Sequence, residues 1–231
     1  LIMAGGFGKR LGEVTKMTPK PLLKIGERHI VEIVLERLKT VPFGRTFMSI
    51  YHLSEQFQEF AKTLGPEQDI ELIFETEPLG TAGAISMVPD MQTNHLMVMN
   101  ADVLSDVSLS KVWDFHVRFD CDMTLAVVPH EIKVPYGVVK FGGDGGFSEI
   151  SEKPTYVSHV LSGIYFLSPR ARGLISEQQR IDMPDLIELA SKSDLSVKVF
   201  PVFEYWVDVG DVDSLDRAQK RYLNDRKPSG A

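Results

Sequence analysis

The chain has 231 residues, and its 25 lysines and arginines stand against 32 aspartates and glutamates, a formal net charge of −7 at pH 7. This length supports one sizeable core, and the negative balance argues against attraction to nucleic acid through bulk charge. One cysteine, Cys121, cannot form an internal disulfide or supply a cysteine-based zinc site. No apolar run reaches the roughly 18 residues of a membrane span and no leader pattern opens the chain, so we expect a cytoplasmic protein without membrane or nucleic-acid partners.

Short apolar runs alternate with helical patterns over the first 120 residues. Leu1-Ile2-Met3 resembles the end of a buried strand, so we expect a longer polypeptide to precede it. Alternation of this kind favours a mostly parallel sheet with helices on both faces. The predicted strands lie at 46–51, 70–74 and 96–99, and the predicted helices lie at 31–39, 55–64 and 81–88.

Beyond residue 120 the predicted strands are joined by shorter links, which indicates a smaller and more antiparallel region. Gly142-Gly143-Asp144-Gly145-Gly146 has the composition of a hairpin turn. We expect one domain over residues 1–225, followed by a polar tail or linker at 226–231. The strands are predicted at 122–128, 137–141, 147–150 and 160–167, and the helices at 185–191 and 212–224.

A glycine-rich segment, Ala4-Gly5-Gly6-Phe7-Gly8-Lys9-Arg10, follows the first predicted strand directly. Three glycines in four positions let backbone N–H groups approach a phosphate chain closely. The segment is not a dinucleotide fingerprint, because Leu11 stands where the third glycine is needed, and it is not a Walker A loop, because Arg10 follows Lys9. An anion-binding loop and an ordinary glycine-rich surface loop both remain open at this point.

Basic residues are concentrated just after this loop, in a chain that is otherwise acidic. Five cations and one acid, Glu13, lie between residues 9 and 24. Lys20 stands between Pro19 and Pro21, whose fixed φ angles suit a charge that must be held in place. The pattern favours a triphosphate-binding site over a solvated basic face. The five cations are Lys9, Arg10, Lys16, Lys20 and Lys24.

Seven segments, in order along nearly the whole chain, resemble the signature of the sugar-1-phosphate nucleotidylyltransferases. The resemblance implies a GT-A/Rossmann-like α/β fold, with a mostly parallel mixed sheet flanked by helices and a smaller antiparallel sugar-binding region. Residues 182–186 and 200–206 resemble the bacterial subgroup with N-terminal CBS regulatory domains, which would lie outside this chain. The seven segments are 4–24, Glu77-Pro78-Leu79-Gly80-Thr81-Ala82, Asn100-Ala101-Asp102, Tyr136-Gly137-Val138-Val139, Glu152-Lys153-Pro154, Gly163-Ile164-Tyr165 and Trp206-Val207-Asp208-Val209-Gly210.

This resemblance implies an enzyme in which a sugar 1-phosphate oxygen attacks the α-phosphorus of a nucleoside triphosphate and pyrophosphate leaves. Asp102 and Asp208 would share one Mg²⁺, although either aspartate alone is typical of a turn or a helix cap. Arg10 and Lys20 would neutralise the triphosphate and the developing charge. The nucleotide would also lie against Ala4, Gly5, Gly6 and Gly8, and against Gly80 and Thr81 at the start of a helix.

The resemblance places the sugar phosphate on the second half of the chain. Lys153 would bind its phosphate and Glu152 would accept hydrogen bonds from sugar hydroxyls, although a charged neighbour on an exposed edge strand is the alternative for Glu152. Tyr136, Gly137 and Gly163 belong to the same sugar-binding segments. We read the six histidines as structural, because no two share a helical ligand spacing: His29, His52, His95, His116, His130 and His159.

The base is predicted from Glu75, a carboxylate near the position where uridylyl and thymidylyl relatives carry a base-reading glutamine. A carboxylate accepts hydrogen bonds, and guanine presents donors at N1 and its amino group, so GMP transfer from GTP is favoured. Uridylyl transfer, thymidylyl transfer and a non-catalytic regulatory subunit remain alternatives. The expected partners are a nucleoside triphosphate, a sugar 1-phosphate and a second copy of the chain in a homo-oligomer.

Overall fold

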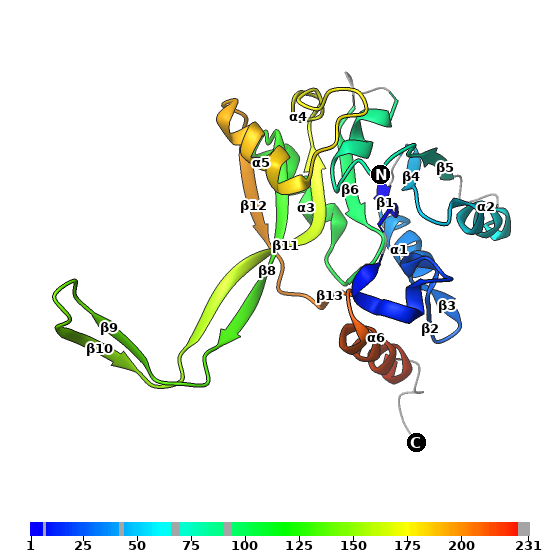
Figure 1. Ribbon diagram of the computed structural model, residues 1–231. Coiled ribbons are helices and arrows are strands. Elements are labelled where there is room, and N and C mark those ends of the chain that lie inside the picture. Colours follow the sequence, from blue (N-terminus) through cyan, green and yellow to red (C-terminus); the bar gives the residue numbers. More distant parts are fainter. Residues whose placement is uncertain (7, 42–43, 66–69, 90–93, 226–231) are drawn as a thin grey trace.

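The computed structural model describes residues 1–6, 8–41, 44–65, 70–89 and 94–225, and the predicted tail at 226–231 lies outside the described residues (Figure 1). A central sheet is flanked by helices, and a long two-stranded ribbon leaves the body on one side. Within these ranges, no helix combines the length and apolar character needed to cross a membrane.

Seven strands form the central sheet in the order β12-β8-β11-β6-β1-β4-β5. β1 pairs in parallel with β4 and β6, β4 pairs in parallel with β5, and β11 runs antiparallel to its neighbours β6 and β8. The predicted mostly parallel mixed sheet is therefore confirmed. The strands are β1 (Ile2–Met3), β4 (Thr46–Ile50), β5 (Ile70–Phe74), β6 (Leu96–Asn100), β8 (Met123–Lys133), β11 (Thr155–Leu167) and β12 (Val197–Pro201).

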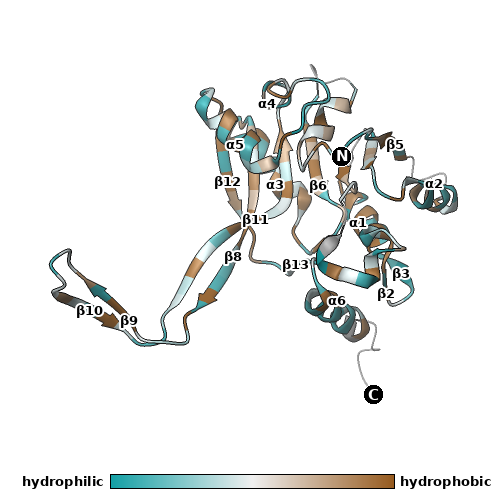
Figure 2. Cartoon of the chain, in the orientation of Figure 1, coloured by the Kyte–Doolittle hydropathy of each residue, from teal (hydrophilic) through white to brown (hydrophobic). Residues whose placement is uncertain are grey.

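Helices cover both faces of this sheet, and α1 (Ile30–Leu38) buries an apolar stripe against it. The stripe consists of Ile30, Val31, Val34, Leu35 and Leu38, which recur at the helical period. Figure 2 shows the hydrophobic colour concentrated in the strands of the body, while α2 and α6 are largely hydrophilic on the side in view. The other helices are α2 (Ser54–Thr63), α3 (Leu109–Arg118), α4 (Pro169–Arg172), α5 (Met183–Lys192) and α6 (Val212–Asp225).

The α-helix predicted at 81–88 is wrong, because this stretch holds a short 3₁₀ helix, η3 (Gly83–Met87). Hydrogen bonds to a distant segment compete with helical ones here. The amide of Ala82 donates to the carbonyl of Ile181 (3.0 Å), and the amide of Ile181 donates to the carbonyl of Leu79 (3.0 Å). Gly80 adopts a φ of +80° at this contact, where a Cβ would lie 2.6 Å from the Ile181 carbonyl oxygen.

Short 3₁₀ helices and short strands lie in the loops at the carboxyl edge of the sheet. β13 pairs antiparallel with β7, so that Asp208 stands opposite Val103, the residue after Asp102. These elements are η1 (Lys9–Thr15), η2 (Lys20–Leu22), β2 (Lys24–Ile25), β3 (Arg28–His29), β7 (Val103–Ser105) and β13 (Trp206–Asp208).

Beyond the sheet, β8 and β11 continue as a two-stranded ribbon that ends in the hairpin β9 (Val138–Phe141) and β10 (Phe147–Ser151) (Figure 1). We call residues 129–160 the arm. The body-facing half of β8 is buried, whereas the five residues from Pro129 to Lys133 are exposed. The ladder is interrupted between Leu161 and Tyr165, where Gly163 has a φ of +78° and packs against Asn100 and Val103.

Candidate active site

A cavity of about 530 Å³ opens at the carboxyl edge of β1 and β6. In an open α/β sheet this edge is where ligands bind. All nine residues predicted to contact the nucleotide line it, together with seven others. The lining residues are Met3, Ala4, Gly5, Gly6, Gly8, Arg10, Lys20, Pro21, Glu75, Pro78, Gly80, Thr81, Asn100, Asp102, Arg180 and Gly210.

The charged centre of this cavity is an ion-pair cluster around Lys20. Its Nζ donates to Oδ2 of Asp102 and lies 3.3 Å from Oδ1 of Asp208. The Lys20 side chain is 8% exposed, so the pairing is shielded from solvent. The Nη2 atom of Arg10 approaches Oδ2 of Asp208 at 3.5 Å from the solvent side. Four residues that the sequence predicted to act together are thus in one network.

Strand pairing explains why Asp102 and Asp208 meet although 106 residues separate them. Asp102 follows β6, and the β7–β13 ladder brings Asp208 beside Val103. The amide of Val209 also donates to the carbonyl oxygen of Asp102 (3.0 Å). Burial raises the pKa of Asp102, the Lys20 ammonium opposes that effect, and the Asp208 carboxylate adds to it.

The donor set of this cluster fits a magnesium ion. Oδ1 of Asp102 is buried and has no hydrogen-bond partner among the described residues. Within the described part of the chain, no group of three or more histidine, cysteine, aspartate or glutamate side chains could hold a metal. Mg²⁺ suits such a sparse site, because it is commonly bound by one or two carboxylates and completes its shell with water and substrate phosphates.

Hydrogen bonds from Thr15 stabilise the glycine-rich segment after β1, which we call the glycine loop. The Thr15 hydroxyl donates to the carbonyl oxygens of Gly8 (2.9 Å) and Gly12 (3.3 Å), and the amide of Leu11 also donates to Gly8. Thr15 is buried, so the segment ends in an anchored threonine. The anchor fixes where Arg10 enters the cavity.

Glu75 follows β5 and lies directly under the glycine loop. A Cβ on Gly5 would come within 2.7 Å of Oε1 of Glu75, so the glycine allows the carboxylate and the loop to meet. The amide of Leu79 donates to Oε2 (3.1 Å). Burial raises the pKa of Glu75, against the hydrogen bonds from Leu79 and Ser49.

Thr81 does not present its amide at a helix N-terminus as the sequence predicts. Its N–H and hydroxyl both donate to Oδ1 of Asp182, at 2.9 and 3.3 Å, and the hydroxyl accepts from the amide of Met183. This clamp holds the segment before α5 against the cavity and brings in Arg180, which sequence reasoning missed. No local motif marks Arg180, because its position depends on a contact between segments about 100 residues apart.

The structure places the residues predicted to bind the sugar phosphate in two separate regions, the edge of the cavity and the arm. Gly163 packs against Asn100 at the edge of the cavity. The other four gather on the arm, where the amide of Lys153 donates to the carbonyl of Tyr136 (3.2 Å) and Gly137 packs against Glu152. Their side chains are exposed, and among the described residues none of these four lines the cavity. The structure therefore brings the two arm motifs to each other but not to Lys20.

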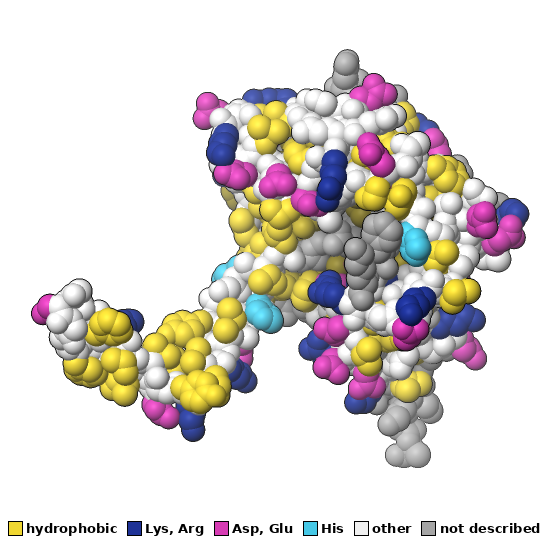
Figure 3. All heavy atoms as spheres, viewed as in Figure 1, with side chains coloured by type: hydrophobic (Ala, Val, Ile, Leu, Met, Phe, Trp, Pro, Cys, Tyr) yellow, Lys and Arg dark blue, Asp and Glu magenta, His cyan; other side chains and the backbone are white. Residues whose placement is uncertain are grey.

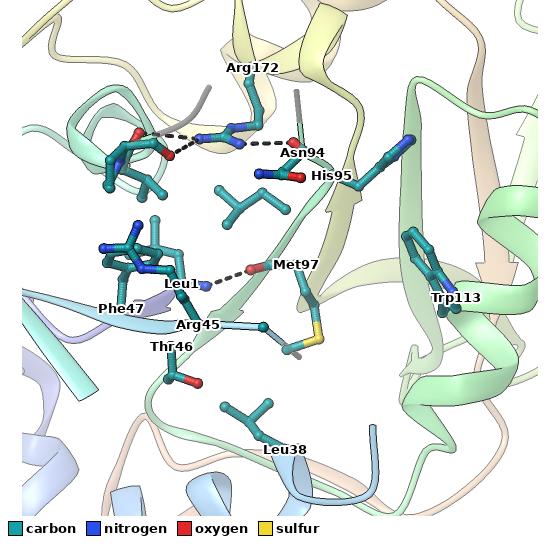
Figure 4. Close-up of a pocket in the computed structure, with 14 residues that line it drawn as sticks. Leu1, Leu38, Arg45, Thr46, Phe47, Asn94, His95, Met97, Trp113 and Arg172 are labelled. Carbon is teal, nitrogen blue, oxygen red and sulfur yellow. Dashed lines mark hydrogen bonds between the residues drawn. The ribbon is translucent and has the colours of Figure 1, made fainter. Parts of the chain in front are cut away.

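A second cavity, of about 610 Å³, lies at the opposite end of the strands. Figure 4 shows Arg172 bonded to the carbonyl of Asn94 (2.9 Å) and the amino group of Leu1 bonded to the carbonyl of Met97. No predicted site residue lines this cavity. We assign it no catalytic role.

The exposed histidine that lines this second cavity, His95, contacts a buried one, His116. Nδ1 of His95 lies 2.9 Å from Nε2 of His116, and Nδ1 of His116 lies 2.8 Å from the hydroxyl of Thr124. No spacing in the sequence marks this pair, because His95 precedes β6 and His116 belongs to α3. The contacts agree with the structural reading of these two histidines.

Solved nucleotidyltransferases share this fold. HddC from Yersinia pseudotuberculosis matches with a TM-score of 0.73 and 23% identity, over 96% of this chain and 97% of that one. CTP:phosphocholine cytidylyltransferase from Streptococcus pneumoniae matches with a TM-score of 0.69 and 19% identity, over 96% and 97% of the two chains. The class defined by the sheet and its edge cavity is therefore that of an α/β nucleotidyltransferase fold.

The Nucleotidyl transferase family profile matches residues 1–225, and the chain belongs to that family. The catalytic subunit beta of mannose-1-phosphate guanylyltransferase from Drosophila pseudoobscura pseudoobscura is 31% identical over 222 residues, 91% of this chain and 58% of the relative. Mannose-1-phosphate guanylyltransferase 1 from Arabidopsis thaliana is 30% identical over 242 residues, 100% of this chain and 66% of the relative. The chain thus spans about three fifths of the length of these curated relatives.

Proposed function

We propose that this chain transfers a nucleotidyl group, preferentially GMP, from a nucleoside triphosphate to a sugar 1-phosphate and releases pyrophosphate. The observation that carries the proposal is the ion-pair cluster of Lys20, Arg10, Asp102 and Asp208, of which the first three line the cavity. Two cations and two carboxylates around one cavity match the needs of phosphoryl chemistry, where positioning and charge neutralisation supply most of the catalysis.

We assign a separate role in this reaction to each group of residues around the cavity. Backbone N–H groups of the glycine loop face the phosphates, and Lys20 and Arg10 neutralise charge on the α- and β-phosphoryl oxygens. An oxygen of the sugar phosphate attacks the α-phosphorus, and the bond from that phosphorus to the oxygen bridging to the β-phosphorus breaks. Pyrophosphate carries away the electron pair of that bond. When bound, Mg²⁺ held by Asp102 and Asp208 would supply further charge stabilisation.

The guanine preference rests on Glu75. Its Oε1 faces the glycine loop, while Oε2 is already engaged by the amide of Leu79. An ionised carboxylate accepts hydrogen bonds, and guanine offers N1–H and an amino group on one edge. The curated relatives named above are guanylyltransferases, and HddC was also solved as a complex with GMP-PN, with a TM-score of 0.71 to this chain. A CBS regulatory region outside residues 1–231 stays a prediction from segments 182–186 and 200–206.

A pyrophosphate-release assay tests the proposal directly. The four common nucleoside triphosphates are crossed with several aldose 1-phosphates, mannose and glucosamine 1-phosphates among them, at fixed Mg²⁺. We expect turnover with GTP to exceed turnover with the other triphosphates. No release with any pair would contradict nucleotidyl transfer, and a clear preference for UTP or dTTP would contradict the role given to Glu75.

A further inference from the structure

The arm exposes an apolar face that nothing in the described chain covers. In the β9–β10 ladder, Phe141 stands opposite Phe147 and Val139 opposite Ile150, so these four side chains share one face. Phe141 is 72% exposed and Phe147 is 68% exposed. Figure 3 shows hydrophobic side chains gathered along the arm. A two-stranded ribbon is marginally stable in water by itself, so we expect another protein surface to cover this face.

The exposed area is that of a protein interface. Eight large hydrophobic side chains, distributed over both faces of the arm, together expose on the order of 800 Å², which is what one partner of a standard interface buries. Two such arms, exchanged between two copies, would form a closed symmetric contact. The eight residues are Ile132, Tyr136, Val139, Phe141, Phe147, Ile150, Tyr156 and Val157.

The arm also carries Lys153 and Glu152, the two residues predicted to bind the sugar phosphate, and neither lines the cavity. Lys153 and Glu152 are 69% and 71% exposed, and their ammonium and carboxylate lie 4.0 Å apart. Lys153 has a left-handed φ of +45°, a conformation that costs a non-glycine residue free energy and that clusters at functional positions. The cavity of the body, for its part, has no lining residue from the arm among those described.

Backbone pairing runs along the arm in two ladders, β8–β11 and β9–β10, joined by single hydrogen bonds. Pairing runs from Val128–Val160 to Lys133–Thr155, continues through the Val134 amide to Pro154 and the Lys153 amide to Tyr136, and reaches Val138–Ser151. In Figure 1 this ribbon leads away from the body, and the hairpin lies far from the loop that follows β1. Lys153 is accordingly not among the residues that line the cavity of its own chain.

We propose that the chain acts as a dimer in which each arm crosses to the second copy, packs its apolar face there, and delivers Lys153 and Glu152 to the second copy's cavity. The proposal rests on the proposed function for the roles of these two residues toward a sugar phosphate. Exposed apolar side chains near lining residues in sequence offer a surface for the arm: Val14 and Met17 lie between Arg10 and Lys20, and Val212 lies two residues after Gly210. They are 46%, 79% and 59% exposed.

Sedimentation equilibrium of the full chain tests the contact without any enzymatic readout. We expect a mass of twice 25.9 kDa. The Phe141→Ser/Phe147→Ser double variant should be monomeric with an unchanged circular dichroism spectrum, and Val117→Ser, an exposed apolar change on α3, should stay dimeric. A monomeric wild type, or a dimer that survives the double variant, would overturn the proposal.

Complementation tests whether the arm acts across the dimer. One chain carries Glu152→Ala/Lys153→Ala, the other carries Asp102→Asn, and the heterodimer is purified through two different tags. We expect each homodimer to be nearly inactive and the heterodimer to recover about half of wild-type turnover, because one of its two sites is intact. A heterodimer as inactive as the homodimers would show that the arm serves its own body, and a fully active Glu152→Ala/Lys153→Ala homodimer would show that it delivers neither group.

The two readouts separate this proposal from the proposed function. If even the wild type releases no pyrophosphate, nucleotidyl transfer is wrong, while the sedimentation result still decides whether the arms are exchanged.

Discussion

The Nζ atom of Lys20 lies 3.3 Å from Oδ1 of Asp208, across 188 residues of chain. The same ammonium also donates to Asp102. A single buried cation therefore balances two carboxylates that would otherwise repel each other at the inner end of the cavity. The Lys20 ammonium also opposes the rise that burial causes in the pKa of Asp102.

Removing either carboxylate should abolish turnover and leave the fold intact. Asp102→Asn and Asp208→Asn are each expected to lower kcat by about 10²-fold or more, as for the loss of one strong electrostatic stabiliser. Initial rates of pyrophosphate release measure the effect, and circular dichroism melting checks the fold. Asp213→Asn, an exposed acid in the first turn of α6, is the matched control. Wild-type rates in either site variant, or in excess EDTA, would contradict the magnesium assignment.

Two arginines of the cavity should affect different kinetic constants. Arg10 reaches Asp208 at the cluster, so Arg10→Ala should chiefly lower kcat. Arg180 lines the cavity beside the Thr81–Asp182 clamp, so Arg180→Ala should raise KM for the triphosphate by about tenfold with a smaller effect on kcat. Arg118→Ala, on α3, is the control. A KM effect for Arg10→Ala together with a kcat effect for Arg180→Ala would contradict this assignment of roles.

Base selectivity should depend on one side chain. Glu75→Gln keeps the acceptor for the Leu79 amide and replaces the other carboxylate oxygen by an amide donor. The ratio of kcat/KM for GTP to that for UTP should fall by about 10- to 100-fold, since an unmatched donor at a buried site is costly. Glu77→Gln, an exposed neighbour, should leave the ratio unchanged. An unaltered ratio in Glu75→Gln would remove Glu75 from base recognition.

The reaction should proceed by direct displacement. The described lining of the cavity holds no cysteine, histidine or serine, the Thr81 hydroxyl is engaged by Asp182 and Met183, and the Lys20 ammonium is engaged by two carboxylates. With no free thiol, imidazole, hydroxyl or amine among these lining residues, we expect both substrates to be bound before chemistry. Labelled pyrophosphate should not enter GTP unless the sugar phosphate is present. Exchange at a rate near kcat without sugar phosphate would reveal a covalent intermediate.

Acid should destabilise the fold through His116. Burial, followed by the proximity of His95, lowers its pKa from 6.5 to about 4, against the opposing effects of Asp122 and Asp120. The unfolded chain therefore binds a proton here more tightly, and the free energy of unfolding falls as pH drops from 6.5 toward 4. The contribution is about 2 kcal/mol between pH 7.5 and 5.

Urea denaturation of wild type and His116→Gln at both pH values measures this contribution. The variant should lose less stability on acidification, whereas His130→Gln, an exposed change, should follow the wild type. Equal losses in wild type and His116→Gln would contradict the neutral, buried state of His116.

The sequence by itself determined the sheet and most of the cavity. Periodic apolar runs predicted β4, β5 and β6 to within a residue, and the side chains of β4 and β6 are largely buried. The motifs after β1, β5 and β6 converge because the carboxyl ends of parallel strands meet at one edge. Lys20, Asp102 and Glu75 were therefore identifiable before their contacts were known.

Tertiary structure alone decided the rest. The 3₁₀ helix of residues 83–87, the position of Arg180 and the His95–His116 contact depend on bonds between segments far apart in sequence, which leave no local pattern. The arm is the clearest case. Tyr136, Gly137, Glu152 and Lys153 are recognisable as motifs, but the direction of a two-stranded ribbon is set by the interrupted ladder at Gly163 and by pairing across the whole arm. Residue identity gives a side chain its chemistry, and the fold determines which cavity that side chain can reach.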